Sequence, residues 1–444
     1  MTLFELFGLV IALIAVLGYV NHRFVRLPET IGITVVAMSM SVGITGYGFI
    51  NPEGGRWAAN ALSGIRFSEV VFHGMLGLLL FAGSLTIELK ALAREKGTIF
   101  VLATAGVVIS TLAVGYGFYG VTLLFGYEMP LLHCILLGAI VSPTDPVAVI
   151  GILRRAGMTQ RMEMQVAGES LFNDATGVVA VLTVLALLAG SQDTGASEVL
   201  WLLGRQALGG IGLGILLGAA GLLLLRGAST SHTICIMSTV AVATGGYALG
   251  EHVGVSALIS VIVAGLLIGN LGRSHAVPKD TQEHVFEFWK LVDQLLNLVL
   301  FGLIGIQVLA FQPTLVQFLL SAAAVPVALA SRWASVAAPI GLMSRFRRYD
   351  EHTIAILTWG GLRGGLSVAL AMSLPWSLDK PLILSATYAI VIFSILVQAL
   401  TLDKLVTALR KRSGGSHDPR PKVADPYATS EATPKPESSD LDMP

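Results

Sequence analysis

The heptapeptide GESLFND, residues 168–174, places two carboxylates and an amide inside a run of residues that is otherwise apolar enough to cross a membrane. A charged side chain at the bilayer centre costs at least ~2.5–3.5 kcal/mol on insertion scales, so it normally faces a water-filled cavity and serves an ion or proton path. At about 100° per residue, the four polar side chains of this stretch lie on one side of a helix within two turns. They are Glu169, Ser170, Asn173 and Asp174. Such a set of oxygen atoms suits a hard cation and indicates an ion site.

The composition is that of a membrane protein. Of the 444 residues, 54% are hydrophobic and 13% are charged, whereas soluble domains carry about 25% charged residues. The net charge is zero, which gives no electrostatic basis for binding nucleic acid. Cys134 and Cys235 stand alone inside apolar runs and form no disulfide or metal pattern. We therefore expect an all-α polytopic membrane protein with reduced thiols, no cofactor and no nucleic-acid partner.

Thirteen apolar runs are each long enough to cross ~30 Å of hydrocarbon, some of them with tilt. The first has no positive charge before it and no small-residue cleavage site after it, so we expect a span rather than a signal peptide. The expected spans lie near residues 3–20, 30–50, 69–88, 98–125, 131–152, 166–190, 199–225, 231–249, 254–271, 288–310, 314–342, 352–374 and 381–409.

The basic residues of the connections alternate along the chain. The connections after the odd-numbered spans hold fourteen lysines and arginines, and those after the even-numbered spans hold three. Because basic loops stay in the cytoplasm, the alternation predicts an amino terminus outside the plasma (inner) membrane and a carboxyl terminus in the cytoplasm. Residues 413–444 are rich in Pro, Ser, Asp, Glu and Lys and nearly free of large aliphatic residues, which predicts a disordered cytoplasmic tail.

Two prolines interrupt the span at residues 131–152, where residues 142–146 read SPTDP. Each proline removes a backbone donor and disfavours a helical conformation of the residue before it. Since Pro143 and Pro146 are three residues apart, we expect at least one unwound turn near the midplane. Its freed carbonyls and the Asp145 carboxylate must face the protein interior, because lipid cannot pair with them.

A second interruption, GGLRGG at residues 360–365, places four glycines around Arg363 in the span at 352–374. Each glycine weakens a helix by ~1 kcal/mol relative to alanine. Paired interruptions in two halves of a chain indicate an inverted-repeat secondary transporter, although the register of the two repeats stays open. Close helix packing is the alternative reason for the glycines. Arg363 needs an anionic partner, and we expect Glu169 to supply it in a buried ion pair.

Asp174 has no obvious cationic partner. Desolvation and the nearby Asp145 favour the protonated form of its carboxyl group. A carboxylate that is partly protonated near neutral pH can hold either a proton or a cation, which predicts proton/cation exchange. A polar patch that merely joins helices is the alternative, and serine and asparagine often form one.

Three motifs occur in order: SPTDPVAV at residues 142–149, GESLFND at 168–174 and GGLRG at 360–364. With them, residues 1–410 resemble the monovalent cation:proton antiporter family, in the branch of NhaP-type antiporters and sodium/proton exchangers. The resemblance implies a thirteen-span antiporter fold with inverted repeats and two broken helices, and a homodimer. It also implies an interface domain of residues 1–97 and 191–310, against which a core domain of residues 98–190 and 311–412 moves.

The resemblance also implies roles for individual residues. Those expected to bind the transported Na+ (and also Li+) or proton are Asp174, Asp145, Ser170 and Thr144. Glu169 and Arg363 are the implied structural ion pair, and Asn173 is expected to steady the crossing of the two broken helices. Relatives that exchange electrogenically have a second aspartate where this chain has Asn173, so the resemblance implies electroneutral exchange of one proton per cation, with no enzymatic activity.

Other functions stay open at this point. A potassium/proton antiporter fits the same residues, because selectivity depends on sub-ångström features of the site. A cation channel is less favoured, since no filter sequence such as TVGYG is present. An intramembrane aspartyl protease built on Asp145 and Asp174 is disfavoured because its typical Gly-x-Gly-Asp motif is absent. Scattered histidines leave pH sensing open, with His284 as the first candidate, but most of them lie at predicted span ends, where a hydrated histidine is ordinary.

Overall fold

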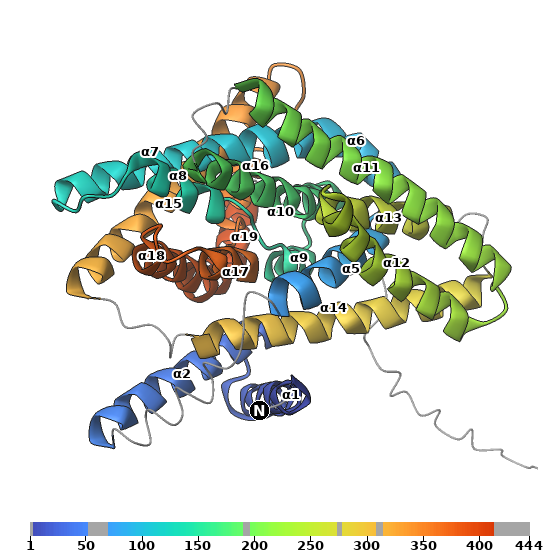
Figure 1. The fold of residues 1–444 in the computed structure, drawn as a ribbon, viewed down its shortest axis with the longest axis horizontal. Coiled ribbons are helices and arrows are strands. Elements are labelled where there is room, and N and C mark those ends of the chain that lie inside the picture. The colour runs from blue at the N-terminus through green and yellow to red at the C-terminus, as the bar shows by residue number, and fades with distance from the viewer. Residues whose placement is uncertain (1–2, 52–69, 190–195, 273–277, 308–313, 413–444) are drawn as a thin grey trace, which may run out of the picture.

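The computed structural model describes residues 3–51, 70–189, 196–272, 278–307 and 314–412, and these residues form helices with no strand (Figure 1). Nine helices in this part of the chain are long and apolar enough to cross a membrane. Three shorter apolar helices lie at residues 70–86, 131–140 and 257–271. The predicted all-α membrane fold is therefore confirmed. The expected tail at 413–444 lies outside the described residues.

Each of the thirteen predicted spans corresponds to one helix or to consecutive helices. The first seven spans are α1 (Leu3–Val20) with η1 (Asn21–Val25), α2 (Glu29–Ile50), η2 (Val70–Leu76) with α5 (Gly77–Thr86), α6 (Leu89–Val101) with η3 (Leu102–Gly106) and α7 (Val107–Leu124), α8 (Leu131–Ile140) with α9 (Val147–Arg155), α10 (Gln160–Ala189), and α11 (Ala196–Gly227). The remaining six are α12 (His232–Val253), α13 (Ala257–Leu271), α14 (Lys279–Gln307), α15 (Leu315–Met343), α16 (Thr353–Trp359) with α17 (Gly365–Ser373), and α18 (Lys380–Phe393) with η6 (Ser394–Ala399) and α19 (Leu400–Arg412).

Several helices begin earlier than the predicted spans. The fourth span was expected from residue 98, but its helix begins at Leu89, and α14 begins at Lys279 rather than near residue 288. The added turns carry charged residues such as Lys90 and Asp280. An apolar run marks only the part of a helix that fits the hydrocarbon, whereas backbone hydrogen bonding continues into the water beyond it.

The described helices fall into two groups that make more contacts within themselves than with each other. In one group, α14 packs against α2 and α5, and α13 packs against α5, α11 and α12. In the other, α15 packs against α7 and α18, and α8 packs against α7 and α10. Figure 1 shows α14 running across the molecule, with α1 and α2 on one side of it and the second group on the other.

Both expected helix breaks are present. The fifth span stops at Ile140 and resumes at Val147, and the twelfth stops at Trp359 and resumes at Gly365. The glycines of the second break allow close approach of other side chains. A Cβ atom on Gly361 would overlap Arg332 of α15, and a Cβ atom on Gly364 would overlap the Asp145 carboxylate. These two positions therefore exclude any larger residue without a shift of the site.

A buried carboxylate ties α6 to α10 and to the connection between α15 and α16. Glu95 accepts hydrogen bonds from Arg161 Nε at 3.1 Å, from Gln165 Nε2 at 2.8 Å and from Arg347 Nη2. The Glu95 side chain is 6% exposed, whereas its two arginine partners are about one third exposed. This cluster joins three segments that lie far apart in the sequence.

We expect Glu95→Ala to lower the free energy of unfolding by about 1.5–3 kcal/mol, the usual contribution of hydrogen bonds to a charged group. Thermal unfolding of the purified chain in detergent measures this loss. Arg154→Ala is the matched control, because Arg154 pairs with Glu163 from an exposed position and such pairs contribute only ~0–1 kcal/mol. Equal losses from the two variants would contradict the structural role of Glu95.

Candidate functional site

The two unwound segments cross and bind each other through backbone groups. The amide of Asp145 donates to the carbonyl of Leu362 at 2.7 Å. In the opposite direction, Arg363 Nη1 donates to the carbonyls of Ser142 and Pro143, the latter at 3.1 Å. The carbonyls that the prolines release from the helix are thus paired inside the protein, as burial in hydrocarbon requires.

The polar side of α10 supports this crossing at Thr144. Asn173 Nδ2 donates to Thr144 Oγ1 at 2.7 Å, and the Thr144 amide donates to Asn173 Oδ1 at 3.2 Å. Ser170 Oγ donates to the Thr144 carbonyl. All three residues are buried. Side chains of α10 therefore pair the amide, the carbonyl and the hydroxyl of Thr144, which lies outside any helix.

Asp145 and Asp174 lie at the crossing with their carboxylates close enough to repel each other. Both residues are half-buried, unlike the buried polar residues around them. Asp145 Oδ1 accepts a hydrogen bond from the Val147 amide at 2.9 Å, at the start of α9. Within the described residues, the Asp174 carboxylate forms neither an ion pair nor a hydrogen bond. It is therefore available to bind a proton or a cation.

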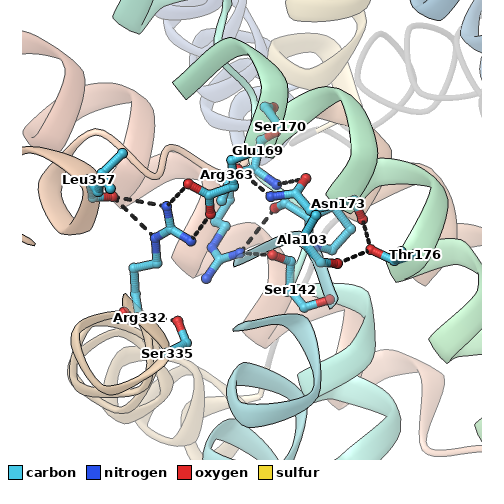
Figure 2. Close-up of polar contacts among 12 residues, drawn as sticks. Ala103, Ser142, Glu169, Ser170, Asn173, Thr176, Arg332, Ser335, Leu357 and Arg363 are labelled. Carbon is cyan, nitrogen blue, oxygen red and sulfur yellow. Dashed lines mark hydrogen bonds and ion pairs between the residues drawn. The ribbon is translucent and has the colours of Figure 1, made fainter. Parts of the chain in front are cut away.

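The predicted ion pair between Glu169 and Arg363 is wrong. Glu169 instead pairs with Arg332 of α15, with Nη1–Oε1 at 2.5 Å and Nη2–Oε2 at 3.1 Å. The Arg332 side chain is 8% exposed and the Glu169 side chain 3%. Arg332 also donates to the Leu357 carbonyl, at 2.9 Å from Nη2 and 3.3 Å from Nε. Figure 2 shows Arg332 reaching both Glu169 and Leu357, while Arg363 extends to Ser142.

Arg363 differs from the prediction because the carbonyls of the unwound turn need hydrogen-bond donors. Arg363 supplies donors to the carbonyls freed beside Pro143, and its amide donates to Ser394 Oγ at 2.9 Å. Arg332, on an unbroken helix, is left to neutralise Glu169 in a bidentate pair. The sequence did contain a signal for Arg332, since a lone arginine inside an apolar span needs an anionic partner.

A third membrane carboxylate, Asp293 of α14, was also missed. It is half-buried and lies close enough to Asp145 for the two charges to repel. Asn297 Nδ2 donates to Asp293 Oδ1 at 3.1 Å. Asp293 belongs to the first helix group, so carboxylates from both groups of helices meet near the crossing. Its position inside the span predicted at residues 288–310 was the available signal.

The arrangement provides oxygen ligands with a net negative charge. Two half-buried carboxylates lie beside hydroxyl and backbone carbonyl oxygens, the donor set that hard cations prefer. Glu169 is paired with Arg332, and Arg363 donates from Nη1 to backbone carbonyls while its Nη2 has no partner among the described residues. A proton or a metal cation can therefore compensate Asp174, and the site is suited to binding and release rather than to bond cleavage.

Comparisons with known proteins agree with this chemistry. A family model described as "Sodium/hydrogen exchanger, transmembrane" matches residues 9–408. The Na(+)/H(+) antiporter NhaP of Pseudomonas aeruginosa is 39% identical, over 93% of this chain and 100% of its own. ApNhaP of Aphanothece halophytica, also a Na(+)/H(+) antiporter, is 28% identical over 89% of this chain and 72% of its own.

The fold is shared with a solved structure. The sodium proton antiporter MjNhaP1 from Methanocaldococcus jannaschii matches with a TM-score of 0.70 at 18% identity, over 93% of this chain and 99% of that one. The predicted antiporter fold is thus confirmed. Together with the family match over most of the chain and the 39% identity to NhaP, it shows that this chain belongs to the transmembrane sodium/hydrogen exchanger family.

Proposed function

We propose that this chain exchanges Na+ for H+ across a membrane, and that the Asp174 carboxylate binds the two cations in turn. One observation carries the proposal: Asp174 is half-buried beside a second carboxylate and forms no ion pair among the described residues. Asp145, Ser170 and Thr144 complete the cation site with carboxylate, hydroxyl and carbonyl oxygens, and Asn173 holds Thr144 in place.

Exchange of one proton per sodium ion is the stoichiometry expected when Asp174 alone exchanges its cation. Glu169 is paired with Arg332, and Asn173 has no acidic proton to release. The charge of the loaded site is therefore the same whether Asp174 holds H+ or Na+. Such a transporter is electroneutral, and it accepts Li+ as a second hard monovalent cation. No feature of the described residues favours potassium.

The grouping of the helices supports transport by alternating access. The core domain comprises residues 98–190 and 311–412, and it moves against the interface domain, residues 1–97 and 191–310. Few contacts join the two described groups, so relative motion disrupts little packing. The protein acts as a homodimer in the plasma membrane, with its amino terminus outside. The loop charges support this orientation, since fourteen basic residues follow odd-numbered spans and three follow even-numbered ones.

The first test replaces the exchanging carboxylate. In proteoliposomes with an imposed pH gradient and an internal pH dye, Na+ or Li+ should collapse the gradient with the wild-type chain but not with Asp174→Ala. Asp174→Asn should fail as well, because an amide holds no exchangeable charge, whereas Asp174→Glu should keep part of the activity. Normal exchange by Asp174→Ala would rule out this assignment.

The same preparation tests for competition and for coupling. Lowering the external pH should raise the apparent KM of the wild type for Na+, by up to about tenfold per pH unit, because the binding carboxylate must be deprotonated. Electrical recording should detect no net current during exchange. A sustained sodium current without proton counter-movement would instead indicate a channel.

A double-mutant cycle tests the partner of Glu169. Breaking a buried ion pair by removing one partner costs ~3–5 kcal/mol, since the other charge is left uncompensated. We expect Glu169→Gln and Arg332→Gln each to lower thermal stability, and the double variant to be less destabilised than the sum of the two. The matched control is the cycle of Glu169→Gln with Arg363→Gln, which should be closer to additive. Coupling only in the control cycle would restore the pair expected from the sequence.

The role of Asp293 can be measured through sodium affinity. Its carboxylate lies close enough to Asp145 for the two charges to repel, and a negative charge there raises the local concentration of cations. Asp293→Asn should raise the apparent KM for Na+ by a few-fold at low ionic strength and leave kcat within about twofold. Added salt should shrink the difference, because screening weakens the interaction. Complete loss of exchange would show instead that Asp293 is indispensable.

A further inference from the structure

A cluster of three potential metal ligands lies where α12 and α14 begin. His232 is the first residue of α12, and Asp280 and His284 are one turn apart at the start of α14. Each offers one ligand atom, and these atoms all lie within 4.8 Å of one another. His232 Nε2 is 3.0 Å from Asp280 Oδ2, and His284 Nδ1 is 3.9 Å from Asp280 Oδ1. None of the three belongs to the cation site at the helix crossing.

The two histidine rings lie next to each other and have to turn before both can bind one ion. They are stacked, with centroids 4.3 Å apart and an interplanar angle of 19°, whereas a metal ion lies in the plane of each imidazole that binds it. His284 Nδ1 donates to the backbone carbonyl of Asp280 at 2.8 Å, which leaves Nε2 as the nitrogen with the free lone pair. Histidines that bind metals commonly donate their other nitrogen to a carbonyl or carboxylate in this way.

The backbone around the cluster is fixed by other contacts. Thr281, buried at 2% exposure, donates from Oγ1 to the Ser229 carbonyl at 3.1 Å, which joins α14 to the turn before α12. Gln282 Nε2 donates to the Gly272 carbonyl at 3.2 Å. Because neighbouring residues hold the two helix ends together, binding of an ion requires only that the side chains turn, and the backbone loses little entropy.

The local charge also suits a cation. The carboxylates of Asp280, Glu283 and Glu287 all act electrostatically on His284. Lys279 is the opposing charge next to Asp280 in the sequence. Among the described residues, the ion-pair partners of Asp280 are the two histidines rather than a lysine or an arginine. A divalent ion would neutralise the carboxylate and bind both imidazoles.

From this geometry we infer that His232, Asp280 and His284 form a binding site for a divalent transition-metal ion such as Zn2+, which clamps the start of α12 to the start of α14. Two imidazoles and one carboxylate, with water in the fourth position, form a common tetrahedral Zn2+ donor set. Mg2+ and Ca2+ prefer all-oxygen sites and do not fit two nitrogen ligands. The site is separate from the sodium path and does not depend on the proposed exchange mechanism.

The test measures Zn2+ binding to the full-length, tag-free protein in detergent by equilibrium dialysis. We expect one Zn2+ per chain, undisturbed by millimolar Mg2+, and a rise in thermal stability on binding. His232→Ala, His284→Ala and Asp280→Asn should each lower the affinity by tenfold or more. The matched control is His252→Ala at the far end of α12, which is exposed and should bind Zn2+ like the wild type.

Sodium/proton exchange in metal-free buffer verifies that the variants are folded, because none of these residues lies at the transport site. The inference is overturned if the wild type takes up no more Zn2+ than the His232→Ala/His284→Ala double variant. It is equally overturned if His252→Ala loses as much affinity as the cluster variants. Loss of the sodium response with intact Zn2+ binding would contradict the proposed function and leave the metal site standing.

Discussion

Backbone groups inside a bilayer must be paired within the protein, because hydrocarbon offers neither donors nor acceptors. This constraint governs the site at the two broken helices. Pro143 and Pro146 each remove an amide donor and release carbonyls. The guanidinium of Arg363 binds the released carbonyls, and the carbonyl of Leu362 accepts from the amide of Asp145. The unwound turns are thus tied to each other, and this tie holds Asp145 beside Asp174.

The site holds two arginines with different partners. Arg363 donates to the carbonyls of Ser142 and Pro143 through Nη1, and its buried Nη2 has no hydrogen-bond partner among the described residues. Arg332 approaches Glu169 from α15, with Gly361 leaving the space that its side chain occupies. A buried pair of this kind is expensive to desolvate, and breaking it leaves the other charge uncompensated.

Much of the fold could be predicted from the sequence, since the decisive signals are local. Apolar runs mark the spans, and Pro143, Pro146 and the glycines around Arg363 mark the breaks without knowledge of helix packing. The pairing of Glu169 could not be predicted in the same way. Its partner is 163 residues away in the sequence. Two arginines lie inside apolar spans, and only the packing of α15 shows which of them pairs with Glu169.

The site residues show the same division. The polar face of α10 was evident from its periodicity, so the grouping of Ser170, Asn173 and Asp174 was predictable. That Ser170 and Asn173 both bind Thr144 depends on how α10 meets the unwound turn. Asp293 lies in another helix group, and no spacing rule relates it to Asp145. Contacts between helices are set by side-chain packing, which a pattern along one helix does not contain.

The distribution of charge gives a physical basis for coupling. Among the described residues, Asp145, Asp174 and Asp293 form no ion pair, whereas Glu169 is neutralised and Arg363 binds carbonyls. An unloaded site therefore carries uncompensated negative charge, and moving that charge through a low-dielectric barrier costs several kcal/mol. In the proposed exchange, a proton or a sodium ion on Asp174 removes part of this cost. The loaded states of that scheme exchange between the two sides while the empty state does not, which makes the movement of one cation conditional on the return of the other.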